Sequence, residues 1–206
     1  MKKIKISVIV ICLLILVELF SGCSMLYTVK TPKTIAEDQD KQEEIILQGD
    51  FPQQMAYSSG VGGWYTTIIL SADGTFSGEY YDSQMGVTGL DYPHGTVYLC
   101  NFSGKFDIKE KPDDCTYILE LKRLDTDKTQ GEEWIENGVR YVVSNPYGLD
   151  GAKKFALYTP CKKIDNLSQD FLNWRPVYYS DSAENTLGVY ALHNVDEGCG
   201  FFTASN

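Results

Sequence analysis

The pattern that most restricts the fold of this chain lies in residues 64–81. β-Branched and aromatic residues fill both halves of this segment, and Asp73-Gly74 lies between them. Such residues favour extended backbone, and an Asp-Gly pair supplies the positive φ that a tight turn requires, so the segment predicts a β-hairpin. Alternation places Trp64, Thr66, Ile68 and Leu70 on one face of the first half. Phe76 and Tyr80 are their expected partners across the turn.

Similar short patterns recur along the chain between turns rich in Gly, Asp, Asn and Pro. They predict further strands at 53–59, 96–106, 116–121, 139–144, 155–158, 187–193 and 200–203. Only residues 168–174 have the pattern of a short helix, with Phe171, Leu172 and Trp174 facing inward. About eight strands without interleaved helices favour a sandwich or a barrel, and closure into a barrel would remove exposed strand edges.

The N-terminus has the pattern of an export signal. Lys2, Lys3 and Lys5 precede an apolar stretch from Ile6 to Val17, which is interrupted only by a serine. A spanning helix needs roughly 20 apolar residues, so a stretch of this length is too short for a permanent transmembrane anchor. We therefore predict a signal peptide over residues 1–22.

The residues after the apolar stretch resemble the lipobox of bacterial lipoproteins. Small residues, Ser21-Gly22, stand directly before Cys23. The resemblance implies cleavage before Cys23 and lipidation of its thiol, which would anchor the chain at the extracytoplasmic face of the cell membrane. The alternative is an ordinary secretory signal followed by a coincidental cysteine.

The exported chain is strongly acidic. Removing the signal leaves 15 basic and 27 acidic residues, a net charge of −12. This charge argues against a nucleic-acid partner and would repel anionic headgroups, which favours a domain held away from the surface. We predict a lipidated cysteine with a polar tether over residues 23–50 and one β domain over residues 51–206.

Cysteine chemistry leaves two alternatives. Cys100, Cys115, Cys161 and Cys199 remain in the exported domain, without a Cys-x-x-Cys pair. Export permits two disulfides, whose pairing the sequence does not determine, and the other interpretation is four buried free thiols. A zinc site is disfavoured, because neither of the two histidines lies near a pair of cysteines.

Two family resemblances bear on the fold. Gly62-Gly63-Trp64 resembles the Gly-x-Trp motif that begins lipocalin-type barrels, which implies a single antiparallel lipocalin-like barrel of about eight strands with one short helix. A longer set of motifs is similar to an uncharacterised family of Gram-positive lipoproteins, a resemblance that implies no activity. These motifs are Ser59-Gly60, Asp73-Gly74-Thr75-Phe76, Gly78-Glu79-Tyr80, Asp82-Ser83, Tyr92-Pro93, Arg140-Tyr141 and Asn145-Pro146-Tyr147-Gly148.

The sequence contains no nucleophile elbow, zinc-protease motif, phosphate loop or dinucleotide fingerprint. We therefore predict no enzyme activity, catalytic residue, metal or cofactor. His94 is interpreted as a turn residue, and His193 as the end of a strand. Glu79, Asp82 and Asp91 are close enough in sequence to share a calcium or hydrolytic site, but they are also typical solvated turn carboxylates.

Tyrosines gather near the predicted strand ends. They are Tyr80, Tyr81, Tyr92, Tyr98, Tyr147, Tyr178 and Tyr179. Tyrosine combines flat apolar area with a polar tip, which suits a ligand-binding mouth and equally a barrel core. We select Trp64, Tyr80 and Tyr98 as candidate binding residues for a small apolar or sugar-like ligand. The alternative is a structural or protein-interaction lipoprotein without a ligand cavity.

Overall fold

The computed structural model describes residues 45–176 and 185–203. The predicted signal peptide, Cys23, most of the predicted tether, Tyr178 and Tyr179 lie outside these ranges. Within the described residues, no helix has the length and apolar character needed to cross a membrane.

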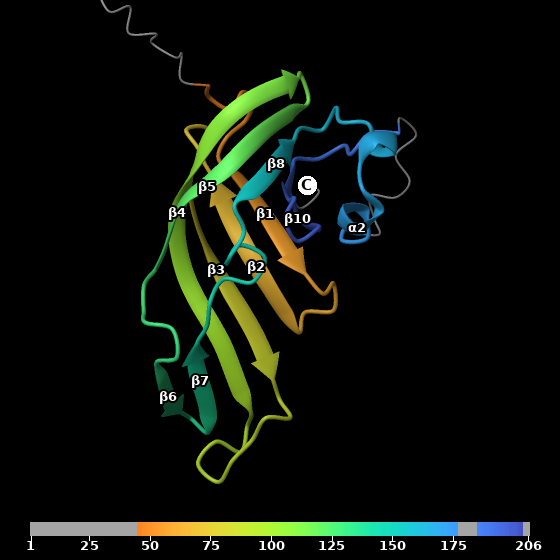
Figure 1. The fold of residues 1–206 in the computed structure, drawn as a ribbon. Helices are drawn as coiled ribbons and strands as arrows, with labels where there is room; N and C mark the ends of the chain where they lie inside the picture. Colours follow the sequence, from red (N-terminus) through yellow and green to blue (C-terminus); the bar gives the residue numbers. More distant parts are fainter. Residues whose placement is uncertain (1–44, 177–184, 204–206) are drawn as a thin grey trace, which may run out of the picture. The chain divides into compact units, whose positions relative to one another are not determined.

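Ten strands form one continuous sheet (Figure 1). They are β1 (Gln53–Ser58), β2 (Trp64–Leu70), β3 (Thr75–Gln84), β4 (Thr96–Asp113), β5 (Thr116–Thr126), β6 (Glu133–Glu136), β7 (Val139–Val143), β8 (Lys154–Tyr158), β9 (Ala191–Asn194) and β10 (Cys199–Thr203). Eight of these strands follow one another around a barrel in the order β1-β2-β3-β4-β5-β8-β9-β10, each antiparallel to its neighbours, and β10 closes the ring on β1. This is an up-and-down barrel, and it confirms the predicted fold class.

The predicted hairpin is the β2–β3 pair. Leu70 lies opposite Phe76 and Thr66 opposite Tyr80, as the alternation required. Gly74 has a φ of 84°, the left-handed conformation that an L side chain rarely adopts. The hairpin prediction is therefore confirmed in both its turn and its inward face.

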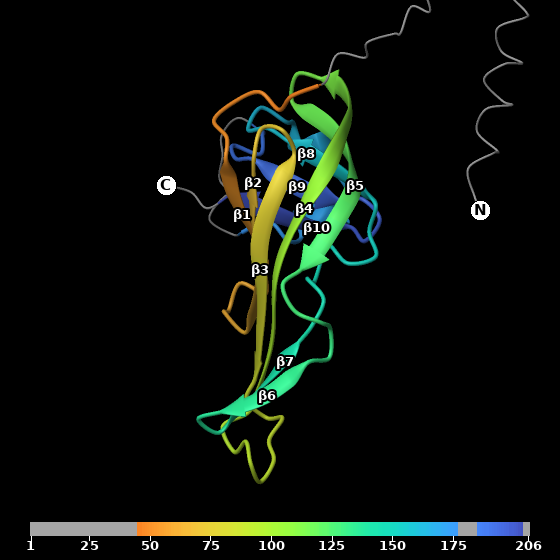
Figure 2. The same cartoon turned by 90° about the vertical axis from the view of Figure 1, so that its left-hand side faces the viewer.

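A short hairpin extends the sheet beyond the barrel. From Phe102 onward β4 pairs with β5, whereas its first residues, Thr96–Leu99, pair in parallel with β7, and β6 pairs with β7. The ends of β3 and β4 therefore project past the barrel with β7 and β6 beside them (Figures 1 and 2). Strand β6 was not predicted from the sequence, because Trp134-Ile135 between two glutamates is too short to show a period.

Inward-facing side chains fill the barrel. The ring of Phe106 lies 4.7 Å from that of Phe76 and 5.0 Å from that of Phe155, measured between centroids. The largest fully buried side chains in this core are Tyr117, Phe106, Phe155, Phe201, Met55, Ile68, Leu70, Leu119, Leu149 and Leu157. Burial of so much apolar surface is the main stabilising contribution to the fold.

Loop residues close the two ends of the barrel. At one end Leu47, which the prediction assigned to the tether, is buried, and its amide donates to the carbonyl of Ala72 at 3.0 Å. At the other end Leu149, from the β7–β8 loop, is buried in the same core. The side-chain amide of Asn194 holds this loop by donating to the carbonyl of Gly148 at 2.9 Å.

Helix α2 (Gln169–Leu172) covers the outer face of β8–β10. Ser168 caps its N-terminus, and Phe171 is fully buried 5.1 Å from the ring of Phe202. The predicted helix is confirmed in part, since it ends at Leu172 and its face does not extend to Trp174. The inward placement of Trp174 is confirmed only in part, because this side chain remains 36% exposed although its ring lies 4.7 Å from that of buried Tyr57.

The strand predicted over 187–193 begins late. Residues before Ala191 do not join the sheet, because Lys163 and Thr186 form an isolated bridge and the amide of Leu187 donates to the carbonyl of Lys162. The segment thus pairs with the loop that contains the short 3-10 helix Ile164–Asn166. Local pairing with a loop gives no periodic signal in the sequence.

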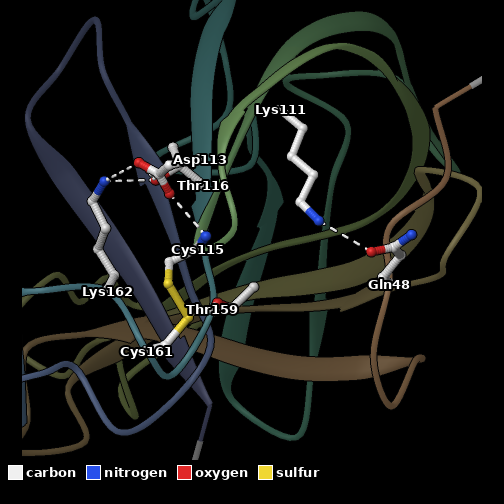
Figure 3. Close-up of a disulfide and its surroundings, with 8 residues drawn as sticks. All are labelled: Gln48, Lys111, Asp113, Cys115, Thr116, Thr159, Cys161 and Lys162. Atoms are coloured by element: carbon white, nitrogen blue, oxygen red, sulfur yellow. Dashed lines mark hydrogen bonds and ion pairs between the residues drawn. A yellow bond between two sulfur atoms is a disulfide. The ribbon is translucent and has the colours of Figure 1, made fainter.

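Two of the four domain cysteines are joined. Cys115, between β4 and β5, forms a disulfide with Cys161, just after β8 (Figure 3). Cys100 and Cys199 are buried free thiols inside the barrel. Neither alternative from the sequence was therefore right, because the turn that carries Cys115 meets the loop after β8, whereas the other two cysteines occupy core positions.

Candidate functional site

Four side chains form a continuous patch at one rim of the barrel. Trp64 begins β2, Tyr80 and Asp82 lie near the end of β3, and Tyr98 lies near the start of β4. Asp82 pairs with Trp64 on one side and with Tyr98 on the other, so these three form a row across three strands. Alternation places Tyr80 on the same face, opposite Thr66. We call Trp64, Tyr80, Asp82 and Tyr98 the rim platform.

The three predicted ligand-binding residues therefore share one face of adjacent strands. This face is the inward face of the barrel, which continues beyond the rim onto the projecting ends of β3 and β4. All four platform side chains are half-buried, so each exposes part of its surface to solvent. The chain enters the barrel at the opposite end, where Leu47 lies beside Ala72 in the β2–β3 turn.

The polar groups of the platform follow β3. The side-chain amide of Gln84 donates to both carboxylate oxygens of Asp82 at 2.9 Å, and the Tyr80 hydroxyl lies 3.5 Å from Oδ2. Burial, with the nearby Asp82 charge, raises the pKa of Tyr80 to about 12. Tyr80 is therefore a neutral phenol at physiological pH and can both donate and accept a hydrogen bond.

An aromatic cluster supports Trp64 from the barrel side. Its rings come from Tyr57, Trp64, Tyr147 and Trp174, and centroid separations are 4.8 Å for Tyr57–Trp64, 5.1 Å for Trp64–Tyr147 and 4.7 Å for Tyr57–Trp174. The rings meet edge to face at 72–78°, the arrangement that aromatic pairs prefer. The cluster thus holds the indole of Trp64 in one orientation.

Two members of this cluster, Tyr57 and Trp174, were not predicted from the sequence as site residues. Tyr57 alternates with the core residue Met55 along β1, which was the only sequence signal for it. Trp174 reaches the cluster from the loop after α2, and no local pattern predicts that contact. Trp174 also lines a surface pocket of about 410 Å³, together with Asp170, Asn173, Glu197 and Gly198.

Of the other predicted tyrosines, two lie away from the rim platform and one joins the aromatic cluster beside it. Tyr81 points to the opposite face of the sheet and stacks on Tyr65 with ring centroids 5.6 Å apart. Tyr92 lies in the β3–β4 loop beneath the guanidinium of Arg140, at 5.6 Å from the ring centroid. Tyr147 joins the aromatic cluster and is 49% exposed.

Arg140 lies one row further along the sheet than the platform row, opposite Thr96. Its Nε donates to Glu133 Oε2 at 3.0 Å, and its Nη2 donates to the same oxygen. This pairing raises the pKa of Arg140 and neutralises its charge locally. The Asp82 carboxylate therefore leaves the platform electronegative.

The three carboxylates that could have shared a site do not meet. Glu79 lies on the outer face beside Tyr65. The pKa of Tyr65 is raised by burial and by the Glu79 carboxylate. Asp82 lies on the inner face, and Asp91 is an exposed residue of the β3–β4 loop. Among the residues with described coordinates, no three His, Cys, Asp or Glu side chains group so as to hold a metal ion.

The histidines and free cysteines occupy separate surroundings. His94 lies in a turn, as predicted, with Nδ1 3.0 Å from the carbonyl oxygen of Asn137. His193, in β9, is buried under α2 beside the ring of Phe171. Burial raises the pKa values of both the Cys100 and the Cys199 thiols to about 11, so these are protonated core groups rather than nucleophiles.

No protein-family model, curated protein or solved structure matches this chain.

Proposed function

We propose that this chain is an exported, lipid-anchored protein that binds a small ligand on the rim platform at the extracytoplasmic face of the cell membrane. The observation that carries the proposal is the convergence of Trp64, Tyr80 and Tyr98 around Asp82 on one half-exposed face. Flat aromatic surfaces with a few fixed polar groups are the usual composition of small-molecule sites. The site is a non-catalytic one in this proposal.

Two features support the export and the anchoring. The first is the leader that ends in Ser21-Gly22-Cys23. The second is the disulfide Cys115–Cys161, because disulfides persist in oxidising compartments outside the cytosol. The described body begins near residue 45, so roughly twenty residues separate it from the lipidated cysteine in this proposal. Such a tether can lift the acidic domain off an anionic surface.

The packing of the barrel favours a ligand that lies on the rim over one that enters the interior. The rings of Phe76, Phe106 and Phe155 pack together inside the barrel, and Leu149 fills the core at the platform end. Protein interiors are close-packed, so an apolar guest would have to displace these side chains. The half-exposed platform needs no such displacement.

The test is native mass spectrometry of the mature chain purified from its own host. We expect a retained small molecule, released by the Trp64→Ala variant and kept by the matched variant Tyr65→Ala, whose side chain lies on the opposite face of β2. A clean apo mass for the wild-type chain, together with no binding to any small-molecule class in solution, would contradict the proposal.

A second candidate function, docking to another envelope protein, is favoured by a different observation. The β3–β4 loop at the tip of the projection exposes Met85, Val87 and Leu90, and Leu90 has no burial at all. Exposed apolar side chains that gather at one end of a molecule are typical of protein-interaction sites. A partner that crosslinks to the wild-type chain but not to Leu90→Ser would support this function.

A further inference from the structure

We infer that the rim platform binds a neutral oligosaccharide of at least two sugar units, which lies across strands β2, β3 and β4. This inference rests on the proposed function, and it names the class of ligand for the same site. It follows from the spacing of the aromatic residues, from the charge of the surroundings and from the polar side chains of β3 between the aromatic residues. These are Tyr80, Asp82 and Gln84, which we call the polar column.

The spacing comes from the register. Trp64, Asp82 and Tyr98 occupy paired positions on three adjacent strands. Neighbouring strands are about 4.8 Å apart, so the backbone positions of the two aromatic residues are about 10 Å apart. Two linked pyranose rings span a comparable length. A ligand of two linked rings can therefore contact both aromatic residues.

The polar column separates the two aromatic side chains. Tyr80, Asp82 and Gln84 follow one another on the inward face of β3 and contact each other through the Asp82 carboxylate. A carboxylate, an amide and a phenol together offer both donors and acceptors. Sugar hydroxyls, which also donate and accept, match this column, and the apolar faces of the rings match the flanking aromatic surfaces.

The same column disfavours apolar and anionic ligands. An apolar chain laid over it would remove water from the Asp82 carboxylate and return no hydrogen bond, which is costly. An anionic ligand would meet the Asp82 charge, and the guanidinium of Arg140 is already paired with Glu133. A neutral, hydroxyl-rich chain is the class that satisfies both the aromatic and the polar groups.

The experiment is isothermal titration calorimetry of the mature chain with glucose oligomers of one to six units, in both 1,4-linkages, and with the equivalent N-acetylglucosamine oligomers. A long-chain fatty acid and a quaternary ammonium compound complete the set of probes. We expect affinity for one neutral series to rise at least tenfold from one unit to two and to change little beyond four. The other two probes should not bind.

Variants on the two faces of the same strands test the placement. Trp64→Ala and Tyr98→Ala should each abolish the rise in affinity from one sugar unit to two. Tyr65→Ala and Tyr81→Ala, on the opposite face, should keep this rise. Asp82→Asn is nearly isosteric and should not disturb folding. It should weaken binding about tenfold while the thermal transition stays unchanged.

The outcomes separate the ligand class from the function. Binding of the fatty acid or the ammonium compound that depends on Trp64 would overturn the oligosaccharide and leave the proposed function standing. Sugar binding that all four alanine variants retain would overturn the platform as its location. Absence of binding for every probe, together with an apo mass for the protein from its host, would overturn both the inference and the proposed function.

Discussion

The Tyr158 hydroxyl lies 3.2 Å from Nδ1 of His193, beneath the ring of Phe171. Both side chains point to the outer face of the barrel, on the neighbouring strands β8 and β9, and α2 covers them. Burial lowers the pKa of His193, because the charged imidazolium loses hydration under the helix. This pair links the stability of the outer layer to pH.

The first prediction is a loss of stability in mild acid that depends on His193. The folded-state pKa lies below the unfolded value, so the unfolded chain binds more protons between the two values. The contribution of this group is therefore fully present above the unfolded pKa of about 6.5 and is lost as pH falls toward the folded pKa. Urea unfolding at pH 7.5 and pH 5.5 measures the difference.

His193→Gln should reduce this pH dependence. Equal slopes for the wild type and His193→Gln would contradict the prediction. The comparison between variants also cancels the opposite effect of Glu197, whose pKa is raised by burial and by nearby carboxylates.

The second prediction concerns the disulfide Cys115–Cys161, which closes a 46-residue separation in the sequence. Cys115→Ser should lower the free energy of unfolding by about 2–4 kcal/mol, since the unfolded chain gains conformational freedom. Denaturant titration with and without a reductant measures the loss. The reductant should destabilise the wild type and have no effect on the variant.

The surroundings of this disulfide provide a control. Lys162 Nζ lies 2.9 Å from Asp113 Oδ2 at the same junction (Figure 3), with the carboxylate about half exposed and the lysine side chain mostly buried. Solvent at the carboxylate screens the pair, so Lys162→Met should cost about 1 kcal/mol, less than the loss of the disulfide. A larger loss for Lys162→Met than for Cys115→Ser would show that the ion pair, rather than the covalent link, joins these loops.

The third prediction uses two glycines of the β7–β8 loop. Gly148 and Gly151 both have positive φ, at 85° and 78°. A Cβ on Gly148 would lie 2.9 Å from Cδ1 of Tyr57 and 3.1 Å from Cζ of Phe201, whereas a Cβ on Gly151 would meet nothing within 4 Å. Both alanine variants carry the backbone strain of about 1 kcal/mol, and Gly148→Ala adds overpacking of about 1–3 kcal/mol.

Thermal unfolding should therefore rank the wild type first, Gly151→Ala second and Gly148→Ala last. Because Tyr57 belongs to the aromatic cluster that supports Trp64, Gly148→Ala should also alter the near-ultraviolet circular dichroism. Identical spectra and equal melting temperatures for the two variants would contradict the packing described at this end of the barrel.

The fourth prediction concerns Cys23. In the host, mass spectrometry of a membrane fraction should find Cys23 as the N-terminal, diacylated residue, because two acyl chains give stable anchoring where one is marginal. Cys23→Ala should remove the lipid and shift the chain out of the detergent phase in phase partitioning. An intact, unmodified Cys23 on the exported wild-type chain would contradict the lipoprotein proposal.

The sequence alone was sufficient for features encoded within a few residues. The β2–β3 hairpin, its Asp73-Gly74 turn and its inward face follow from alternation and turn chemistry. The repetition of such patterns indicated about eight strands; the described residues contain ten, because β6 is too short to show a period in the sequence. Trp64, Tyr80 and Tyr98 could be selected as candidates because alternation along each strand is local information.

Tertiary structure decided what depends on residues far apart in the chain. The parallel pairing of β7 with the start of β4 left an open face beyond the barrel, and the register brought Trp64, Asp82 and Tyr98 into one row. Long-range contacts also decided which cysteines form the disulfide Cys115–Cys161. The same holds for the packing of Trp174 against Tyr57. Such contacts join segments by closing long loops of chain, and the packing that selects them leaves no periodic signal in either segment.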